Sequence, residues 1–427
     1  MLPSYKVVDV TNGMQYPNGR SVNIHDHVVG WNNTSQGINQ GFIQLGGQGT
    51  KFVKVPAGSS SKSGTYVMSI NNNRVAVWNW EEIETKICHA FIWENGQLTD
   101  LGPLIGASSC AAMDINDRGQ IVGIADFGPI PSGTPVDELG MKGHAFLYET
   151  NGGGVTDLGV LAGHSMSRAE AVNELGQVVG ISAHWDAPSY TQYSVRPFLY
   201  KDGSLNELTG EEGTAVDIND LGHVLGASQV ASPSGSIQNH PYIWRDGNVE
   251  PIPLDNAAPK AINNGDEVVG EVVSNLPYHC FLFRNGQVVP NLNTLVGGQL
   301  PAGANISGAE DINDKGHILV WGTRPSWGAF MALLVPDKAT LRVKVEGLRE
   351  LVLLILFGVS HDGGGWVLIG KTIRRIPPWG PLSIDHWELV FEYASALLRD
   401  TVEDQSDLEE ARRELRRVID EGIAGHD

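Results

Sequence analysis

The chain has 427 residues, including 52 glycines, and only 18 % of its residues are charged. This composition, with short apolar runs between turn residues, predicts an all-β protein and argues against a mostly helical one. The formal net charge of -20 argues against nucleic acid as a partner, because binding to phosphate requires clustered Lys and Arg.

No cofactor or metal is expected, because Cys88, Cys110 and Cys280 form an odd set without metal-ligand spacing. The first residues, Met-Leu-Pro-Ser-Tyr-Lys, lack the basic and apolar stretches of a secretory signal, which favours a cytoplasmic protein. The longest apolar run, Leu351 to Val359, is half the length of a membrane span, so no span is predicted.

One phrase recurs along the chain, and its clearest copy is Asp-Ile-Asn-Asp-Arg-Gly-Gln-Ile-Val-Gly at Asp114 to Gly123. Its central asparagine recurs at intervals of 44 to 57 residues, a period typical of solenoids, propellers and other arrays. The seven copies are centred on Asn23, Asn71, Asn116, Asn173, Asn219, Asn263 and Asn313.

Each copy predicts four antiparallel strands. The asparagine phrase forms one hairpin through an Asn-Asp-x-Gly type of turn, and a second hairpin follows, with turns such as Asn95-Gly96 and Asp202-Gly203. The first strand of that second hairpin begins at His89, His144, Arg196, His240 or His279. Four strands in about 45 residues match a propeller blade.

The two ends of the repeat region complete each other. The strand around Phe330-Met331 lacks a returning partner, whereas the chain opens with an unpaired strand from Tyr5 to Val10. Joining them completes a seventh blade and removes an exposed sheet edge. We therefore predict a seven-bladed β-propeller over residues 1–336.

These motifs resemble the HAF repeat family. The resemblance rests on the His-Ala-Phe strands, on Thr99 to Gly102 and Thr156 to Gly159, and on the asparagine phrase, and it covers about residues 5–335. It implies a bacterial protein with a β-propeller-like fold. The family is often described as extracellular, and its motif carries no shared biochemical activity.

Several polar groups invite a chemical interpretation. The Asp and Asn residues of the repeated turns do not follow the spacing of a calcium loop, so we interpret them as turn-stabilising groups. The strand-opening histidines are interpreted as structural, tying loops to the neighbouring blade. Ser360-His361-Asp362 contains the residue types of a hydrolase triad, but adjacent residues point in alternating directions. Glu170 and Glu310 lie on predicted inner strands and approach the channel.

Ligand binding is predicted on one face of the propeller. The Asn-Asp-x-Gly and Asn-Gly turns share a face, and long, variable connections occupy the other, where binding usually resides. Aromatic and amide groups on these long loops suit contact with sugar or peptide, although the aromatics alternatively pack under their own loops. The candidate ligand-binding residues are Trp31, Asn33, Asp126, Trp185, Tyr190, Tyr193 and Trp327.

Residues 337–427 predict a small α+β module. Leu348 to Val359 and Trp366 to Ile376 are expected to form two strands, and helices are expected near 384–399 and after the capping box at Ser406. The helical part, residues 383–421, either closes its own core or mediates self-association.

The sequence favours a noncatalytic module that binds carbohydrate or protein through the long-loop face, with the C-terminal module serving attachment or self-association. No nucleophile elbow, phosphate loop or His-Glu-x-x-His motif supports catalysis. The alternative is a hydrolase or lyase acting at the mouth of the channel.

Overall fold

A computed structural model describes most of the repeat region and a short part of the C-terminal region. The described residues are 4–46, 49–54, 64–81, 87–102, 106–107, 109–126, 143–185, 193–231, 237–272, 279–325, 328–336, 366–369 and 372–375. Within these ranges no helix has the length and apolar character needed to cross a membrane. The chain divides into two compact units, residues 5–335 and residues 1–4 with 336–427, and each is described by itself.

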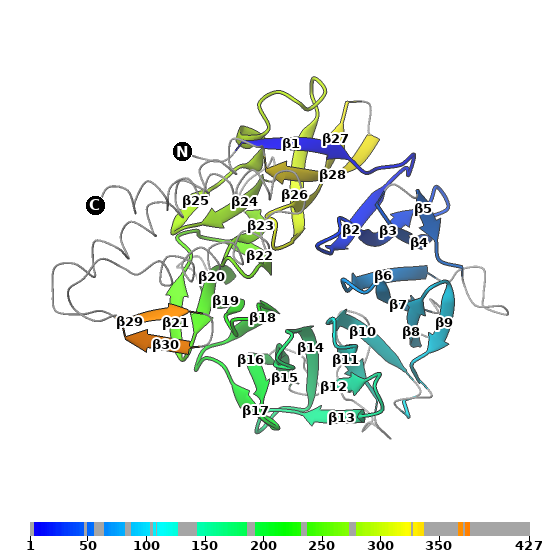
Figure 1. Ribbon diagram of the computed structural model, residues 1–427. Coiled ribbons are helices and arrows are strands. Elements are labelled where there is room, and N and C mark those ends of the chain that lie inside the picture. The colour runs from blue at the N-terminus through cyan, green and yellow to red at the C-terminus, as the bar shows by residue number, and fades with distance from the viewer. Residues whose placement is uncertain are drawn as a thin grey trace. The chain divides into compact units, whose positions relative to one another are not determined.

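The first unit is a seven-bladed β-propeller of four-stranded antiparallel sheets around a central channel (Figure 1). Blade 1 comprises β2 (Pro17–Val22), β3 (Val28–Asn33), β4 (Asn39–Gln44) and β5 (Thr50–Phe52). Blade 2 comprises β6 (Gly64–Ile70), β7 (Val75–Glu81), β8 (Cys88–Glu94) and β9 (Gln97–Asp100). Blade 3 comprises β10 (Cys110–Ile115), β11 (Gln120–Ala125), β12 (His144–Glu149) and β13 (Gly154–Gly159).

The next three blades repeat this order. Blade 4 comprises β14 (Met166–Val172), β15 (Val178–Trp185), β16 (Tyr193–Lys201) and β17 (Ser204–Glu207). Blade 5 comprises β18 (Gly213–Ile218), β19 (Val224–Ala231), β20 (Ile237–Arg245) and β21 (Asn248–Pro251). Blade 6 comprises β22 (Ala257–Ile262), β23 (Val268–Val272), β24 (His279–Arg284) and β25 (Gln287–Val289), followed by the 3-10 helix η1 (Leu292–Leu295).

The N-terminal strand closes the ring, as the sequence predicts. Blade 7 has the order β1 (Tyr5–Asp9), β28 (Gly328–Pro336), β27 (Ile318–Arg324) and β26 (Asn305–Ile312). The side chain of Gln299 covers the free edge of β1, because it accepts from Val7 N at 2.9 Å and donates to Tyr5 O at 2.7 Å. Tyr5 itself is fully buried, so this strand is anchored by packing as well as by hydrogen bonds.

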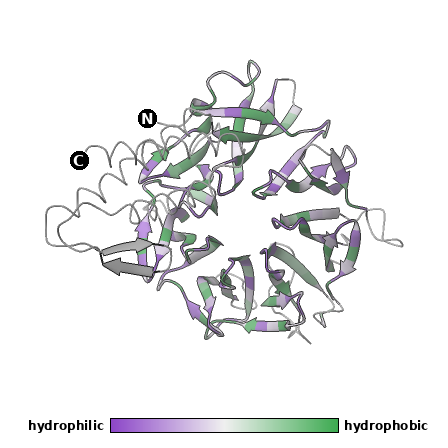
Figure 2. Ribbon diagram, in the orientation of Figure 1, coloured by the Kyte–Doolittle hydropathy of each residue, from purple (hydrophilic) through white to green (hydrophobic). Residues whose placement is uncertain are grey.

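The apolar core is distributed around the ring, in clusters within and between the blades (Figure 2). The phenylalanine of the His-Ala-Phe type of strand is the central contact, since Phe146, Phe198 and Phe281 are each fully buried. The glycine that ends the repeated phrase permits the first two strands to approach closely. A side chain at Gly123 or Gly180 would collide with a backbone carbonyl oxygen of the inner strand.

In the second unit the structure describes one hairpin, formed by β29 (Trp366–Ile369) and β30 (Thr372–Arg375). The prediction of a single strand from Trp366 to Ile376 is therefore wrong. The chain reverses between Ile369 and Thr372, which pair with each other across the hairpin. The strand at 348–359, Ser360-His361-Asp362, both helices and the association segment 383–421 lie outside the described residues.

Candidate functional site

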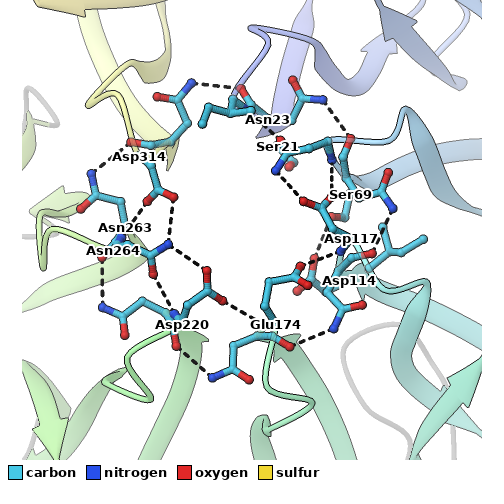
Figure 3. A pocket seen from close by; sticks show the side chains of 18 of the residues that line it. Ser21, Asn23, Ser69, Asp114, Asp117, Glu174, Asp220, Asn263, Asn264 and Asp314 are labelled. Carbon is cyan, nitrogen blue, oxygen red and sulfur yellow. Dashed lines mark hydrogen bonds between the residues drawn. The ribbon is translucent and has the colours of Figure 1, made fainter. Parts of the chain in front are cut away.

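The seven repeated asparagines meet at one end of the channel and form a closed ring of hydrogen bonds (Figure 3). The Nδ2 atom of each donates to the backbone oxygen of the asparagine in the next blade, at 2.9 to 3.1 Å. Asn313 of blade 7 donates to Asn23 O of blade 1 at 3.0 Å, which completes the circle. We call this set the asparagine ring.

The same side chains also hold their own turns. Asn116 Oδ1 accepts from Arg118 N at 3.1 Å and from Gln120 N at 2.9 Å, so the predicted turn-stabilising role is confirmed. Sequence reasoning missed the bond to the next blade. A signal was present, because the position is Asn and never Asp in all seven repeats, and only Asn has both an acceptor and a donor.

The residue after each ring asparagine forms a second circle of contacts, which we call the outer latch. Its backbone N–H donates to the side chain of the equivalent residue in the next blade, as in Asn72 N to Asp117 Oδ1 at 2.7 Å. Asp117, Glu174, Asp220, Asp314, Asn72 and Asn264 serve as acceptors. The seventh position is Ile24, which has no acceptor for Asp314 N.

These residues line a cavity of about 250 Å³ at the short-turn end of the channel. Five carboxylates border it, namely Asp114, Asp117, Glu174, Asp220 and Asp314. A collar of seven Ile and Val side chains, one directly before each ring asparagine, also lines the cavity, and each is only 4 to 6 % exposed. The cavity therefore combines an acidic rim with an aliphatic collar.

Burial raises the pKa of two of the rim carboxylates, Glu174 and Asp314. The pKa of Glu174 is raised by burial and by the charges of Asp117 and Asp220, and burial likewise raises the pKa of Asp314. On the inner strands, burial raises the pKa of Asp217 to about 8, against two backbone hydrogen bonds that lower it. Asp217 Oδ2 accepts from Ile262 N of the next blade at 2.8 Å, so this carboxyl group also joins two blades.

No group of His, Cys, Asp and Glu in the described part of the chain has an arrangement that could hold a metal ion. The repeated carboxylates instead accept backbone amides of a neighbouring blade, as Asp114 and Asp117 do. The turn interpretation therefore holds for the ring asparagines and is wrong for these carboxylates.

Glu170 and Glu310 occur at equivalent bulges of the inner strands. Glu170 accepts from Arg168 Nε at 2.7 Å. Glu310 accepts from Trp321 Nε1 at 2.8 Å and lies 3.5 Å from Lys260 Nζ. Burial and Glu310 raise the pKa of the neighbouring Glu271, and Lys260 lowers it.

The strand-opening histidines His144 and His89 contact their own blade and not the neighbouring one, so the prediction is wrong for these two, whereas His240 Nδ1 lies 3.4 Å from Asp255 in the connection to blade 6. His144 Nδ1 lies 3.0 Å from Asp157 of its own sheet, and the ring of His89 packs 4.8 Å from that of Trp80, also in its own blade. The reason is the pairing of β12 with β13, which places Asp157 opposite Phe146 and next to His144.

At the long-loop end, Trp31 is half-buried and its ring lies edge-on to Tyr66 of the next blade, at a centroid distance of 5.4 Å. Asn39 Nδ2 donates to Tyr66 Oη at 2.9 Å. Asn33 ends β3 on the same side, and its N–H donates to Tyr16 O. The structure thus brings two of the predicted residues, Trp31 and Asn33, to one end of one strand.

Of the other predicted residues, the structure describes the side chain of Asp126. Its Oδ1 accepts from Ser109 N at 2.8 Å, beside the last pair of β10 with β11. Trp185 and Tyr193 pair through their backbones at the ends of β15 and β16, and their side chains lie outside the described part. Tyr190 and Trp327 lie outside it entirely.

No family model and no curated protein matches the chain. Among solved structures, the β-propeller domain of the trilobed protease from Pyrococcus furiosus is similar, with a TM-score of 0.49 and 12 % identity over 75 % of this chain and 93 % of that one. The acylaminoacyl peptidase of Pyrococcus horikoshii has a TM-score of 0.49 and 14 % identity, over 86 % of this chain and 58 % of that one. Trypanosoma rangeli sialidase has a TM-score of 0.42 and 11 % identity, over 86 % of this chain and 64 % of that one.

The chain thus spans less than two thirds of the length of the last two proteins. With TM-scores below 0.5 and identities of 11 to 14 %, these similarities carry no conclusion about this chain.

The asparagine ring is tested by Asn71→Asp, which keeps the acceptor for Val75 N but removes the donor to Asn116 O. The change leaves a buried carbonyl facing a carboxylate, so we expect a loss of about 1–3 kcal/mol in the free energy of unfolding. Urea denaturation measures it, with Asn206→Asp on an exposed outer strand as the matched control. Equal stability of the two variants would contradict the role of the ring.

The buried carboxyl of Asp217 predicts a pH dependence. Because its folded-state pKa of about 8 exceeds the unfolded value of about 4, the folded state binds more protons between these pH values, and stability falls as pH rises. Asp217→Asn removes this titration. As pH rises from 4 to 8, we expect the free energy of unfolding of the variant to increase by more than about 1 kcal/mol relative to that of the unaltered protein. Thermal denaturation across this range is the measurement, and a pH-independent difference would refute the assignment.

Proposed function

We propose that the protein is a noncatalytic binding propeller that recognises carbohydrate or protein at its long-loop end. The first support is that the acidic groups at the opposite, short-turn end of the channel are engaged in hydrogen bonds between blades. Asp114, Asp117, Glu174 and Asp220 each accept a backbone N–H from a neighbouring blade. A general base needs an oxygen directed at the substrate, with a nucleophile or water in reach. These carboxylates serve assembly of the ring instead.

The observation that carries the proposal is the pairing of Trp31 with Tyr66. The two rings come from different blades, lie edge to face, and are half-buried at the end of the channel that carries the long connections. Asn33 lies on β3 with Trp31, and Asn39 lies on the adjacent β4 and donates to Tyr66 Oη. An aromatic ring face beside amide groups suits the faces and hydroxyls of a sugar, so carbohydrate is the preferred ligand class.

The C-terminal residues 337–427 serve attachment or self-association in this proposal. Kinship with HAF repeat proteins, carried by the repeated phrase, is part of the same proposal and assigns no activity.

The binding role is tested with glycan and peptide arrays probed with the full chain. We expect Trp31→Ala and Tyr66→Ala each to weaken array binding about tenfold or more, as loss of a central aromatic contact does. The matched control is Trp93→Ala, which removes a half-buried tryptophan from the short-turn end of β8. Circular dichroism verifies that all three variants fold. Undiminished binding by both Trp31 and Tyr66 variants would rule out this site.

A second candidate function is a hydrolase, and one observation favours it. Glu271 has a raised pKa beside Glu310, whose own carboxylate is held by Lys260 and Trp321. A carboxyl group whose pKa is raised by burial and by a second carboxyl group beside it is suited to general acid catalysis.

A hydrolase of this kind is expected to lose a factor of about 10² to 10⁴ in kcat on Glu271→Gln. Chromogenic glycosides, esters and peptide anilides provide the assay, and Glu211→Gln, an exposed change in the connection before β18, is the control. If the unaltered chain turns over none of these substrates, the binding role is supported. Turnover that depends on Glu271 would replace it with the hydrolase.

A further inference from the structure

The outer latch does not require the negative charge that it carries. Asn72 and Asn264 accept the amide of the preceding blade at 3.0 and 2.7 Å, as the acidic members do. An amide oxygen therefore makes the same bond as a carboxylate oxygen. Yet Asp117, Glu174, Asp220 and Asp314 are all acids, and the charges of Asp117 and Asp220 add to the burial that raises the pKa of Glu174. Like charges placed close together repel one another, and the hydrogen bonds of the outer latch do not explain why acids occupy these positions.

The residue two places after each ring asparagine has a role that differs between blades. Asn73 and Arg118 donate from their side chains to backbone oxygens of the next blade. In blades 4 and 5 this residue is leucine, and Leu175 N and Leu221 N donate to Oδ1 of their ring asparagines at 3.1 Å. Most blades have a polar residue or glycine there. Blades 4 and 5 have leucines that are 61 % and 60 % exposed, the highest values for large hydrophobic side chains in the described part.

The two leucines are neighbours at the edge of the acidic rim. Their blades are joined by the bond from Asn173 Nδ2 to Asn219 O at 2.9 Å, and each leucine directly follows an acid, Glu174 or Asp220. Neither turn, residues 173–177 or 219–223, contains Lys or Arg. Arg118 of blade 3 lies beside Glu174 and donates from Nη1 to its backbone oxygen at 2.9 Å. Singly exposed leucines are common on protein surfaces, but two at equivalent positions beside acids form a patch of defined chemistry.

We propose that the short-turn ends of blades 4 and 5 form a docking surface for a segment of a partner protein that carries a basic side chain flanked by aliphatic ones. The basic group enters the acidic cavity, and the aliphatic groups pack on Leu175 and Leu221. The cavity, about 250 Å³, is smaller than the roughly 300–1,000 Å³ of pockets for drug-sized ligands, which suits a single side chain. The acidic rim repels nucleic acid and anionic membranes, so a peptide is the complementary partner.

The surface is tested by selecting a displayed library of random 12-residue peptides on the full chain. We expect enrichment of sequences in which Lys or Arg is flanked by Leu, Ile or Val. A synthetic copy of the most enriched peptide, followed by fluorescence anisotropy, should bind the Leu175→Ser/Leu221→Ser variant at least about tenfold more weakly. Glu174→Gln keeps the latch acceptor but removes the charge, so it should weaken binding and reduce its salt dependence.

Two control variants separate this surface from the proposed carbohydrate site. Leu98→Ser alters a leucine that is 46 % exposed on an outer strand, and Trp31→Ala alters the opposite end, so both should bind the peptide normally. The inference is overturned if no basic sequences are enriched or if the double leucine variant retains full affinity. It is also overturned if gel filtration shows that the leucines instead pair two copies of this chain.

Discussion

The structure depends on one use of the asparagine side chain. An amide group carries an acceptor and a donor on the same carbon, so one residue both closes its own turn and binds the next blade. In this protein the acceptor holds the turn, and the donor reaches the neighbouring backbone carbonyl at 2.9 to 3.1 Å. Since these groups are buried, each is costly to leave unpaired, and a closed ring leaves none unpaired.

The seam between blades 7 and 1 shows how closure is secured when one contact is lost. Ile24 cannot continue the outer latch, yet three other contacts cross the seam. Asn313 completes the asparagine ring, His317 Nδ1 lies 2.7 Å from Asp26 Oδ1, and Asp311 Oδ2 accepts from Val22 N at 2.7 Å. The N-terminal strand adds its pairing with β28. Closure therefore rests on polar contacts at the channel and on a shared sheet at the periphery.

The repeated sequence was sufficient to predict the blades, their inner strands and the closing strand, because each depends on local turn chemistry and on strand periodicity. The sequence was not sufficient to predict which group in another strand a side chain contacts. The bond of the ring asparagine to the next blade was missed, and the contacts of His89 and His144 were assigned to the wrong blade. Trp366 to Ile376 was predicted as one strand, although the sequence Gly370-Lys371 between the two strands is compatible with a two-residue hairpin turn. The acids of the rim were interpreted as turn residues, whereas they accept amides of neighbouring blades.

The repeated turns at the short-turn end are uniform in backbone structure, but some of their side chains are not needed by the fold. These side chains can therefore determine which ligand this end of the propeller binds. In each turn the fold uses the ring asparagine, the backbone amides and one acceptor on the following residue. That acceptor can be neutral or charged, and in blades 4 to 6 the next residue bonds its ring asparagine through its backbone, as Asn264 with Gly265 and Asp220 with Leu221 illustrate. In blades 2 and 3 the side chains of Asn73 and Arg118 instead bond the next blade. Charge and apolar surface can therefore change at these two positions in blades 4 to 6 without disturbing the ring. The long loops vary by length and the short turns vary by chemistry, so each end of the channel can present its own binding surface on one rigid scaffold.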